Sequence, residues 1–453
     1  MTSTDDTIVA PATPWGESAL AIIRLSGPLV PELGKAVLGR DQTLPHRSAT
    51  PGQYRNREGA WVDEVVATEF AEGKSFTGEP LLELCAHGNP VIVQQIVEDL
   101  VARGARPAES GEFSRRAFLN GKLDLTQAEA IGDLIHARSS HALDMARRQL
   151  RGSIGKWVSE CCAELLNAIA ALEAYIDFPE EDLPPEDSGG PLRTVREVAD
   201  RLEQVREAAH YRDLVSDGIQ TVILGPPNVG KSSLINRLMG EERALVSEEP
   251  GTTRDYIRER FLLGKHCIQI MDTAGIHPPS SDLEERGIQK TLELVDRADF
   301  FLLVLDACAP SPTLPTPVLK RLDPQGCLVL ENKIDLAGSR QHEAFLPAVE
   351  HLRLSLKTGE GFAGFLKAWE EKLDSSRFTP PSDLILVNAR HASAMESIQR
   401  HLVRALEMAA AGEGTEWIAG ELRYALDGFG EIIGKVDNEA MLDQLFQNFC
   451  IGK

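Results

Sequence analysis

The residues with the clearest chemical potential lie at 225–232, where the chain reads GPPNVGKS. They follow a short apolar run and precede a stretch of helical character from Ser233 to Leu238. Glycines at this spacing let backbone amides close around phosphate groups, and a helix N-terminus adds positive potential. Lys231 can then reach β- and γ-phosphates, and the Ser232 hydroxyl can ligate Mg²⁺. A Gly-rich turn can match the same pattern by chance, so the rest of the chain decides.

Further motifs follow in the order that a guanine-nucleotide site requires. A threonine of GTTRD at 251–255 can supply a second Mg²⁺ ligand, and DTAG at 272–275 offers an aspartate for the metal and a glycine amide for the γ-phosphate. In NKID at 332–335, the carboxylate of Asp335 can accept hydrogen bonds from guanine N1 and the 2-amino group, two donors that adenine lacks. Residues 355–357 (SLK) fit the last base-contacting loop. The ordered set excludes coincidence and predicts a GTP site.

The predicted contacts with the nucleotide are spread over these motifs. They are Asn228, Val229, Gly230, Lys231, Ser232, Ser233, Thr252, Thr253, Asp272, Thr273, Ala274, Gly275, Asn332, Lys333, Asp335, Ser355, Leu356 and Lys357. The predicted Mg²⁺ ligands among them are Ser232 and Thr253.

Hydrolysis also needs a group that orients the attacking water. The glutamine that many GTPases place directly after the DTAG glycine is replaced by Ile276. Asp282, Glu284 and Glu285 are candidates, although acidic residues there equally favour the start of a helix. Asn228 can ligate a monovalent cation that would replace a positively charged finger, which on sequence logic alone is the minority interpretation.

Short apolar runs alternate with amphipathic stretches from Ile219 onward, and this pattern fades near Leu373. Continuous apolar runs are typical of strands buried on both faces of a parallel sheet. The alternation predicts a doubly wound α/β domain. The predicted strands are 221–224, 267–271, 300–305 and 327–330.

The segments on either side have a different character. Residues 1 to about 120 mix short β-type runs with Gly and Pro, which predicts a small α+β domain. From 125 to 178 the pattern is helical, and 192–214 and 382–453 are helical again after an acidic break at 179–191. The α/β domain is therefore predicted to be inserted into a helical one. The apolar positions at one-face spacing are Leu165, Ile169, Leu172 and Ile176.

Composition sets limits on the class of protein. The chain has 453 residues, of which 42% are hydrophobic, so several domains with sizeable cores are expected. It shows neither a secretory signal nor a membrane-length apolar run, and a cytoplasmic location is the expectation. A formal net charge of −22 argues against holding nucleic acid mainly through its own phosphate contacts. Six of the seven cysteines are predicted to be small core residues, and none forms a C-x-x-C pair: Cys85, Cys161, Cys162, Cys267, Cys308 and Cys327.

The flanking sequences decide which class of GTPase this is, because the chain resembles the MnmE (TrmE) family of tRNA-modification GTPases over nearly its whole length. The most specific motif is FCIGK at 449–453, a tail that no generic GTPase needs. The other matching motifs are DTIVA at 6–10, ATP at 12–14, IRLSG at 23–27, SFTGE at 75–79, HG at 87–88, GEFSRRAFLNGKLDL at 111–125 and QAEAI at 127–131.

The resemblance implies a domain plan. It consists of an α+β folate-binding and dimerisation domain at 1–121, a helical domain at 122–215 and 378–453, and an inserted Ras-like P-loop GTPase domain at 216–377. It also implies a homodimer and an FAD-dependent partner, MnmG, in a heterotetramer. With a reduced folate of the 5-formyl or methylene type, the pair would add an aminomethyl or carboxymethylaminomethyl group to C5 of the wobble uridine of certain tRNAs.

Functional residues carry over from the family where the motifs match. Folate contacts correspond to Arg24, Glu83, Lys122 and Lys453, and Cys450 matches a cysteine whose role is catalytic or structural. The family uses K⁺, which would be held by Asn228, Ser247, Glu249 and Thr252, and Ser247 joins the cofactor-binding set. Its water-positioning glutamate matches Glu284.

Departures from the family pattern affect loops rather than ligand side chains. They are Glu109-Ser110-Gly111 in place of the usual Pro-Gly pair, Leu356 in place of a small residue, and the acidic segment at 179–191. Two other interpretations stay open: a GTP-switched ribosome-assembly or RNA-binding factor without one-carbon chemistry, and a GTPase subunit that only times its partner's chemistry.

Overall fold

A computed structural model describes most of the chain. The described residues are 6–177, 189–207, 211, 214, 218–240, 258–271, 293–336, 345–374, 378–379, 388–434, 442, 445–447, 449 and 452. They form two compact units, and each unit is assembled from separate stretches of sequence. The first comprises Met1–Gly132, Gln149–Ala163 and Leu426–Lys453, and the second comprises Asp133–Arg148 and Glu164–Ala425.

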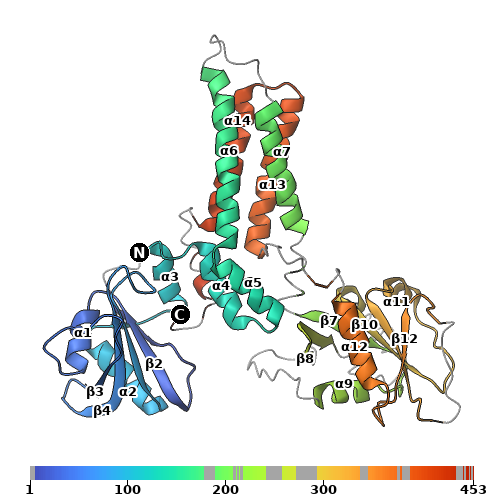
Figure 1. The fold of residues 1–453 in the computed structure, drawn as a ribbon, viewed down its shortest axis with the longest axis horizontal. Helices are drawn as coiled ribbons and strands as arrows, with labels where there is room; N and C mark the ends of the chain where they lie inside the picture. Colours follow the sequence, from blue (N-terminus) through green and yellow to red (C-terminus); the bar gives the residue numbers. More distant parts are fainter. Residues whose placement is uncertain are drawn as a thin grey trace, which may run out of the picture. The chain divides into compact units, whose positions relative to one another are not determined.

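The first unit contains a six-stranded sheet in the order β3-β4-β5-β2-β1-β6, in which only the short β1–β6 pair is parallel. Helices α1 and α2 share one hydrophobic core with one face of this sheet (Figure 1). The strands are β1 (Ile8–Pro11), β2 (Ser18–Ser26), β3 (Thr50–Arg55), β4 (Trp61–Phe70), β5 (Leu81–Gly88) and β6 (Arg106–Pro107). The helices are α1 (Val30–Val37), α2 (Pro90–Ala102) and α3 (Glu112–Leu119).

Alternation along β2 and β5 explains the two faces of this sheet. On β5, Leu82, Leu84 and Ala86 are buried in the core, while Glu83 and Cys85 between them are only partly buried. Arg24 of β2 stands directly opposite Glu83 in the register of the two strands. The polar pair is therefore placed on the face that α1 and α2 do not cover.

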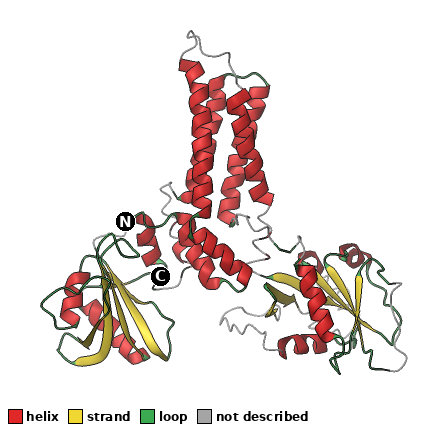
Figure 2. Ribbon diagram, viewed as in Figure 1, coloured by secondary structure: helices red, strands yellow, loops and turns green. Residues whose placement is uncertain are grey.

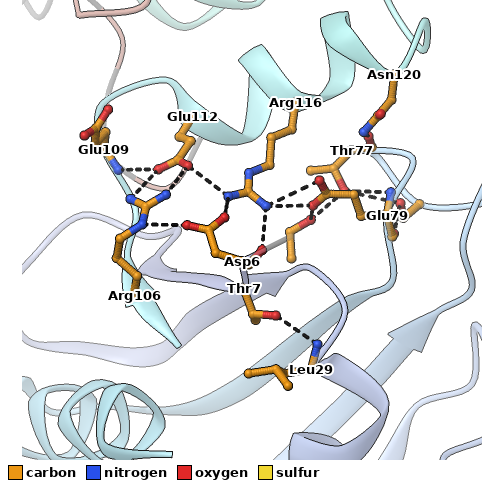
Figure 3. Close-up of polar contacts among 12 residues, drawn as sticks. Asp6, Thr7, Leu29, Thr77, Glu79, Arg106, Glu109, Glu112, Arg116 and Asn120 are labelled. Carbon is orange, nitrogen blue, oxygen red and sulfur yellow. Dashed lines mark hydrogen bonds and ion pairs between the residues drawn. The ribbon is translucent and has the colours of Figure 1, made fainter. Parts of the chain in front are cut away.

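A buried polar network fixes α3 to the N-terminal strand and to the loop before β5 (Figure 3). The guanidinium of Arg116, only 5% exposed, donates to the carboxylates of Asp6, Glu79 and Glu112. Arg106 binds Asp6 and Glu112 as well, at 2.8 and 2.6 Å. Burial raises the pKa of Asp6 and of Glu112, but hydrogen bonds and charges of the two arginines outweigh burial and hold both pKa values below normal. The network thus stays ionised and satisfied.

Most of the remaining helices pack along one another. In the second unit α7 packs on α13, Arg201 of α7 pairs with Glu164 of α6, and His401 of α13 pairs with Glu421 of α14. In Figure 2 the described parts of 125–207 and 388–434 are drawn as helices and loops alone. The helices are α4 (Leu125–His136), α5 (Ser140–Leu150), α6 (Ser153–Asp177), α7 (Gly189–Glu207), α13 (Ala389–Ala410) and α14 (Thr415–Ile433).

Within the described residues, the predicted helical segments are confirmed, with one correction. Leu165, Ile169 and Leu172 are buried as expected, and the side chain of Ile176 lies outside the described residues. Helix α7 begins at Gly189, so the predicted break extended too far toward Pro191. A proline is compatible with a first helical turn because its missing N–H would have no partner there.

The second unit also contains a six-stranded sheet in the order β12-β11-β10-β7-β9-β8, parallel except for the β8–β9 pair. Its two faces bury separate hydrophobic clusters, as a doubly wound sheet requires. The strands are β7 (Ile219–Leu224), β8 (Arg258–Leu263), β9 (His266–Met271), β10 (Phe300–Asp306), β11 (Cys327–Asn332) and β12 (Glu350–Arg353). The helices are α9 (Lys231–Gly240), α11 (Thr316–Arg321) and α12 (Phe362–Leu373). The predicted fold class and the four predicted strands are confirmed.

The cysteine prediction is wrong at one position. Cys161, Cys267 and Cys327 are buried, and burial raises the pKa of the Cys327 thiol to about 12. Cys85 and Cys162 are partly buried, whereas Cys308 is exposed. The reason is that Cys308 lies in the turn after β10, where its N–H donates to the Asp306 carboxylate at 2.9 Å.

Among the described residues, no helix combines the length and apolar character of a membrane span.

Glu69 gives a testable prediction about stability. Its side chain is buried in the first unit, and burial raises its pKa against the opposing charge of His46, 3.8 Å away. Below the unfolded-state pKa the carboxyl is neutral in both states, and stability is lost as pH rises through the higher folded-state pKa. We expect Glu69→Gln to raise the thermal midpoint at pH 8 and to leave it nearly unchanged at pH 4, measured by scanning calorimetry.

The matched control for this change is Glu64→Gln on the same strand, because Glu64 is exposed. A midpoint that falls equally at both pH values in Glu69→Gln would contradict the assignment of a buried, costly charge.

Candidate functional site

The loop between β7 and α9 is shaped by two glycines. Gly225 has φ +144°, and a Cβ there would lie 2.2 Å from the carbonyl oxygen of Val304 on β10. Gly230 has φ +112°, and a Cβ there would lie 2.4 Å from Nδ2 of Asn332. Both positions exclude a side chain, so the backbone can approach the neighbouring strands and leave its amides for a ligand.

Polar groups of this loop and of the first turn of α9 lie around it. The Lys231 ammonium donates to the carbonyls of Gly225 and Pro226, both at 2.8 Å, which holds it over the loop. Ser232 and Ser233 are exposed in the first helical turn, whose amides have no intrahelical acceptor. Asn228 is exposed and has φ +61°, a conformation that asparagine tolerates better than most residues. The arrangement is suited to anionic phosphate groups.

Asn332, at the end of β11, connects this loop to a second one. Its side-chain N–H donates to the Val229 carbonyl at 2.7 Å, and its Oδ1 accepts from the Leu356 N–H at 3.0 Å. Asn332 is 4% exposed, and Val229 and Leu356 are also buried. One carboxamide thus fixes the distance between the phosphate loop and the loop after β12.

The second loop orients the carboxylate of Asp335. The Ser355 hydroxyl donates to Oδ1 of Asp335 at 2.7 Å and accepts from the Thr358 N–H at 3.1 Å. Asp335 is exposed, and this hydrogen bond from Ser355 holds one of its two carboxylate oxygens. Lys333 has φ +70° and pairs with Asp306 at 2.7 Å. A non-glycine residue held in this region is typical of a functional loop.

Several predicted nucleotide and metal residues lie outside the described residues. They are Ser247, Glu249, Thr252, Thr253, Asp272, Thr273, Ala274, Gly275 and Glu284. Of the predicted contacts, the structure brings together Asn228, Val229, Gly230, Lys231, Ser232 and Ser233 with Asn332, Lys333, Asp335, Ser355 and Leu356. Lys357 follows in the same loop and is exposed.

A separate polar cluster lies on the face of the first sheet that α1 and α2 do not cover. Arg24 binds Oε1 of Glu83 through two nitrogens, at 2.7 and 3.0 Å, and also donates to the carbonyl of Gly452 at 3.4 Å. The rings of Phe76 and Phe113 lie 5.9 and 5.8 Å from the guanidinium carbon. The cluster combines a cation, a carboxylate and an aromatic ring that is 37% exposed.

The other predicted residues of this region are only partly accounted for. Lys122 donates to the carbonyl of Gly73 at 3.0 Å, which fastens the loop that carries Phe76. Cys450 and Lys453 lie outside the described residues, but Gly452 between them contacts Arg24.

Sequence reasoning missed three of these contributors. Asp306 has a recognisable signal, because it is a carboxylate at the end of the buried apolar run 300–305. Phe76 and Phe113 have none, since an aromatic residue is more often core than ligand contact, and only the fold places their rings near Arg24.

The parallel sheet, the glycine-shaped phosphate loop and the Asn332–Asp335 loop together define a P-loop protein that binds guanine nucleotides. Family models described as "GTP-binding protein TrmE N-terminus" and "MnmE helical domain" match residues 7–122 and 125–450. The chain is similar to proteins named tRNA modification GTPase MnmE, and it belongs to this family of GTP-hydrolysing enzymes.

The similarity extends from end to end. Identity to the relative from Opitutus terrae is 47%, and the match covers 99% of each chain. Identity to the relative from Akkermansia muciniphila is 40% over 100% of each chain, and to that from Thermotoga maritima 36% over 99% of this chain and 100% of the relative.

Asn332 gives a prediction about nucleotide affinity. Asn332→Ala leaves a buried carbonyl and a buried N–H without partners, each costing about 1–3 kcal/mol. We expect the Kd for GDP to rise by at least about tenfold, measured by competition against a fluorescent nucleotide. Asn236→Ala, an exposed asparagine on α9, is the control and should bind GDP normally. Equal affinities for the two variants would show that the bridge does not organise the site.

Proposed function

We propose that this chain is a K⁺-stimulated GTPase that acts with an FAD-dependent partner, MnmG, on certain tRNAs. The pair adds an aminomethyl or carboxymethylaminomethyl group to C5 of the wobble uridine and takes the carbon from a reduced folate. The observation that carries the proposal is the 47% identity, over 99% of the chain, to a relative named as a tRNA modification GTPase. Cytoplasm is the proposed location.

The first part of the proposal, nucleotide binding, uses residues of the phosphate loop. Ser232, exposed in the first turn of α9, fits Mg²⁺ because the ion prefers oxygen ligands and keeps several waters. Thr253 is the second proposed Mg²⁺ ligand. Lys231 would bind the β- and γ-phosphates, while Asp335 accepts from guanine.

The second part of the proposal, K⁺ binding, depends on Asn228. Asn228 is an exposed residue of the phosphate loop, and its side-chain oxygen is a suitable neutral ligand for K⁺, which would supply positive charge close to the β- and γ-phosphates. Ser247, Glu249 and Thr252 are proposed to complete the set. Glu284 is proposed to orient the attacking water, since Ile276 cannot.

The third part of the proposal, folate binding, depends on the cluster around Arg24. A carboxylate such as Glu83 suits pterin N–H donors, while Arg24 and Lys122 suit the anionic tail of a folate. The half-exposed ring of Phe76 adds a flat apolar surface beside these charges. Lys453 is proposed as a further contact, and Cys450 is proposed to act at this site either through its thiol or structurally.

The assembly is proposed to be a homodimer through residues 1–121, with MnmG as a heterotetramer. The rest of the chain is proposed to form a helical domain, at 122–215 and 378–453, and a GTPase domain inserted into it at 216–377. Because this chain has a net charge of −22, tRNA is held jointly with, or mainly by, the partner.

The cation proposal predicts a difference between salts. GTP turnover should be faster in KCl than in NaCl at equal ionic strength, and Asn228→Ala should remove the difference, with a loss of about tenfold or more in K⁺. Phosphate release is the measurement. The exposed Asn236→Ala serves as the control. Equal turnover of the unchanged protein in the two salts would refute the proposal.

The folate proposal predicts loss of binding without loss of GTP hydrolysis. Arg24→Met removes a charged donor, so the Kd for 5-formyl-tetrahydrofolate should rise about ten- to hundredfold in calorimetric titration, with unchanged GTP turnover. Arg40→Met, an exposed arginine of the same unit, is the control. Reconstitution with MnmG, GTP, tRNA and folate labelled in its one-carbon unit tests the reaction itself. Label that never reaches tRNA uridine would refute the donor role.

A further inference from the structure

Arg237 lies on α9 between the phosphate loop and the loop after β12. Its Nη1 donates to the carbonyl of Leu356 at 2.9 Å. Its Cζ lies 5.1 Å from the centre of the Phe362 ring, within the range of a cation–π contact. A residue of the phosphate-binding helix thus contacts the loop that orients Asp335.

The loop is shaped to receive this guanidinium. Gly359 has φ +91°, and a Cβ there would lie 2.3 Å from Nη2 and 3.2 Å from Cζ of Arg237. Phe362, at the start of α12, is buried and places its ring 5.1 Å from the same guanidinium. A planar, permanently charged group therefore fills a space that a glycine and a ring define.

Arg237 complements the contact made by Asn332. Asn332 accepts from the N–H of Leu356, while Arg237 donates to the carbonyl of the same residue. Ser355, the preceding residue, donates to the Asp335 carboxylate. The position of that carboxylate is therefore set by a loop whose backbone is held from two sides.

We propose that Arg237 is a positioning residue for guanine recognition, which ties the phosphate-binding helix to the base-binding loop. It acts through the backbone at Leu356 and through Ser355, and it does not touch the base. Its effect falls on the Asp335 carboxylate, which must accept from both N1 and the 2-amino group of guanine. The inference concerns GTP binding alone and is independent of folate, K⁺ and MnmG.

Inosine diphosphate (IDP), whose base is hypoxanthine, distinguishes a positioning role of Arg237 from a general structural one. It has the N1–H of guanine but lacks the 2-amino group, so IDP makes only one of the two hydrogen bonds to Asp335. If the carboxylate loses its alignment, GDP loses more affinity than IDP. A merely structural change in the domain would weaken both nucleotides by the same factor.

The experiment measures the Kd of GDP and of IDP for the full chain, by competition against a fluorescent GDP analogue. We expect Arg237→Met to raise the Kd for GDP about tenfold and to lower the IDP-to-GDP ratio of Kd values at least about threefold. Arg237→Lys keeps a cation near Phe362 without the planar fork, so its ratio should be intermediate.

Arg321→Met is the matched control. Arg321 also donates from a helix of the same sheet domain to backbone carbonyls, those of Val295 and Asp296, which lie outside the loop after β12. Its ratio should equal that of the unchanged protein. An unchanged ratio in both Arg237 variants, with or without a general loss of affinity, would overturn the proposal. If Arg237→Met does not fold, the ratio for Arg237→Lys decides alone.

Discussion

The side chain of Asn332 is the constraint on which the nucleotide site depends. Its carboxamide joins the carbonyl of Val229 to the N–H of Leu356, so two loops from distant parts of the sequence share one partner. The same nitrogen forbids a side chain at Gly230. The parallel register of β10 and β11, in which Asp306 is opposite Asn332, then places the Lys333–Asp306 pair beside the bridge. Phosphate and base recognition are thus parts of one buried arrangement.

The first unit uses charge in a comparable way. Arg116 binds Asp6, Glu79 and Glu112 (Figure 3). Glu79 in turn accepts a hydrogen bond from the Ser26 hydroxyl at 2.7 Å. A buried arginine is tolerated here because three carboxylates surround it, whereas breaking a buried ion network is costly. The network thereby fixes helix α3 to the end of β2, the strand that carries Arg24.

The sequence was sufficient for the parts of the fold that local chemistry specifies. The phosphate loop, the NKID motif and the largely apolar strands β7, β9, β10 and β11 were all predicted. Strand β8 was not, because Arg258-Glu259-Arg260 opens it with charge and its antiparallel pairing with β9 depends on the finished sheet. The role of Arg237 was equally hidden, since it depends on Gly359 and Phe362, more than a hundred residues further along the chain.

The contact of Gly452 with Arg24 has a consequence for biosynthesis. A Cβ at Gly452 would lie 2.1 Å from the Pro11 carbonyl, so the tail fits tightly against the first strand. The N-terminal sheet can form early during translation, but the contact between Arg24 and Gly452 can form only after Gly452 has been synthesised. A nascent chain or a truncated product that ends before Gly452 can therefore contain the folded sheet and still lack this contact.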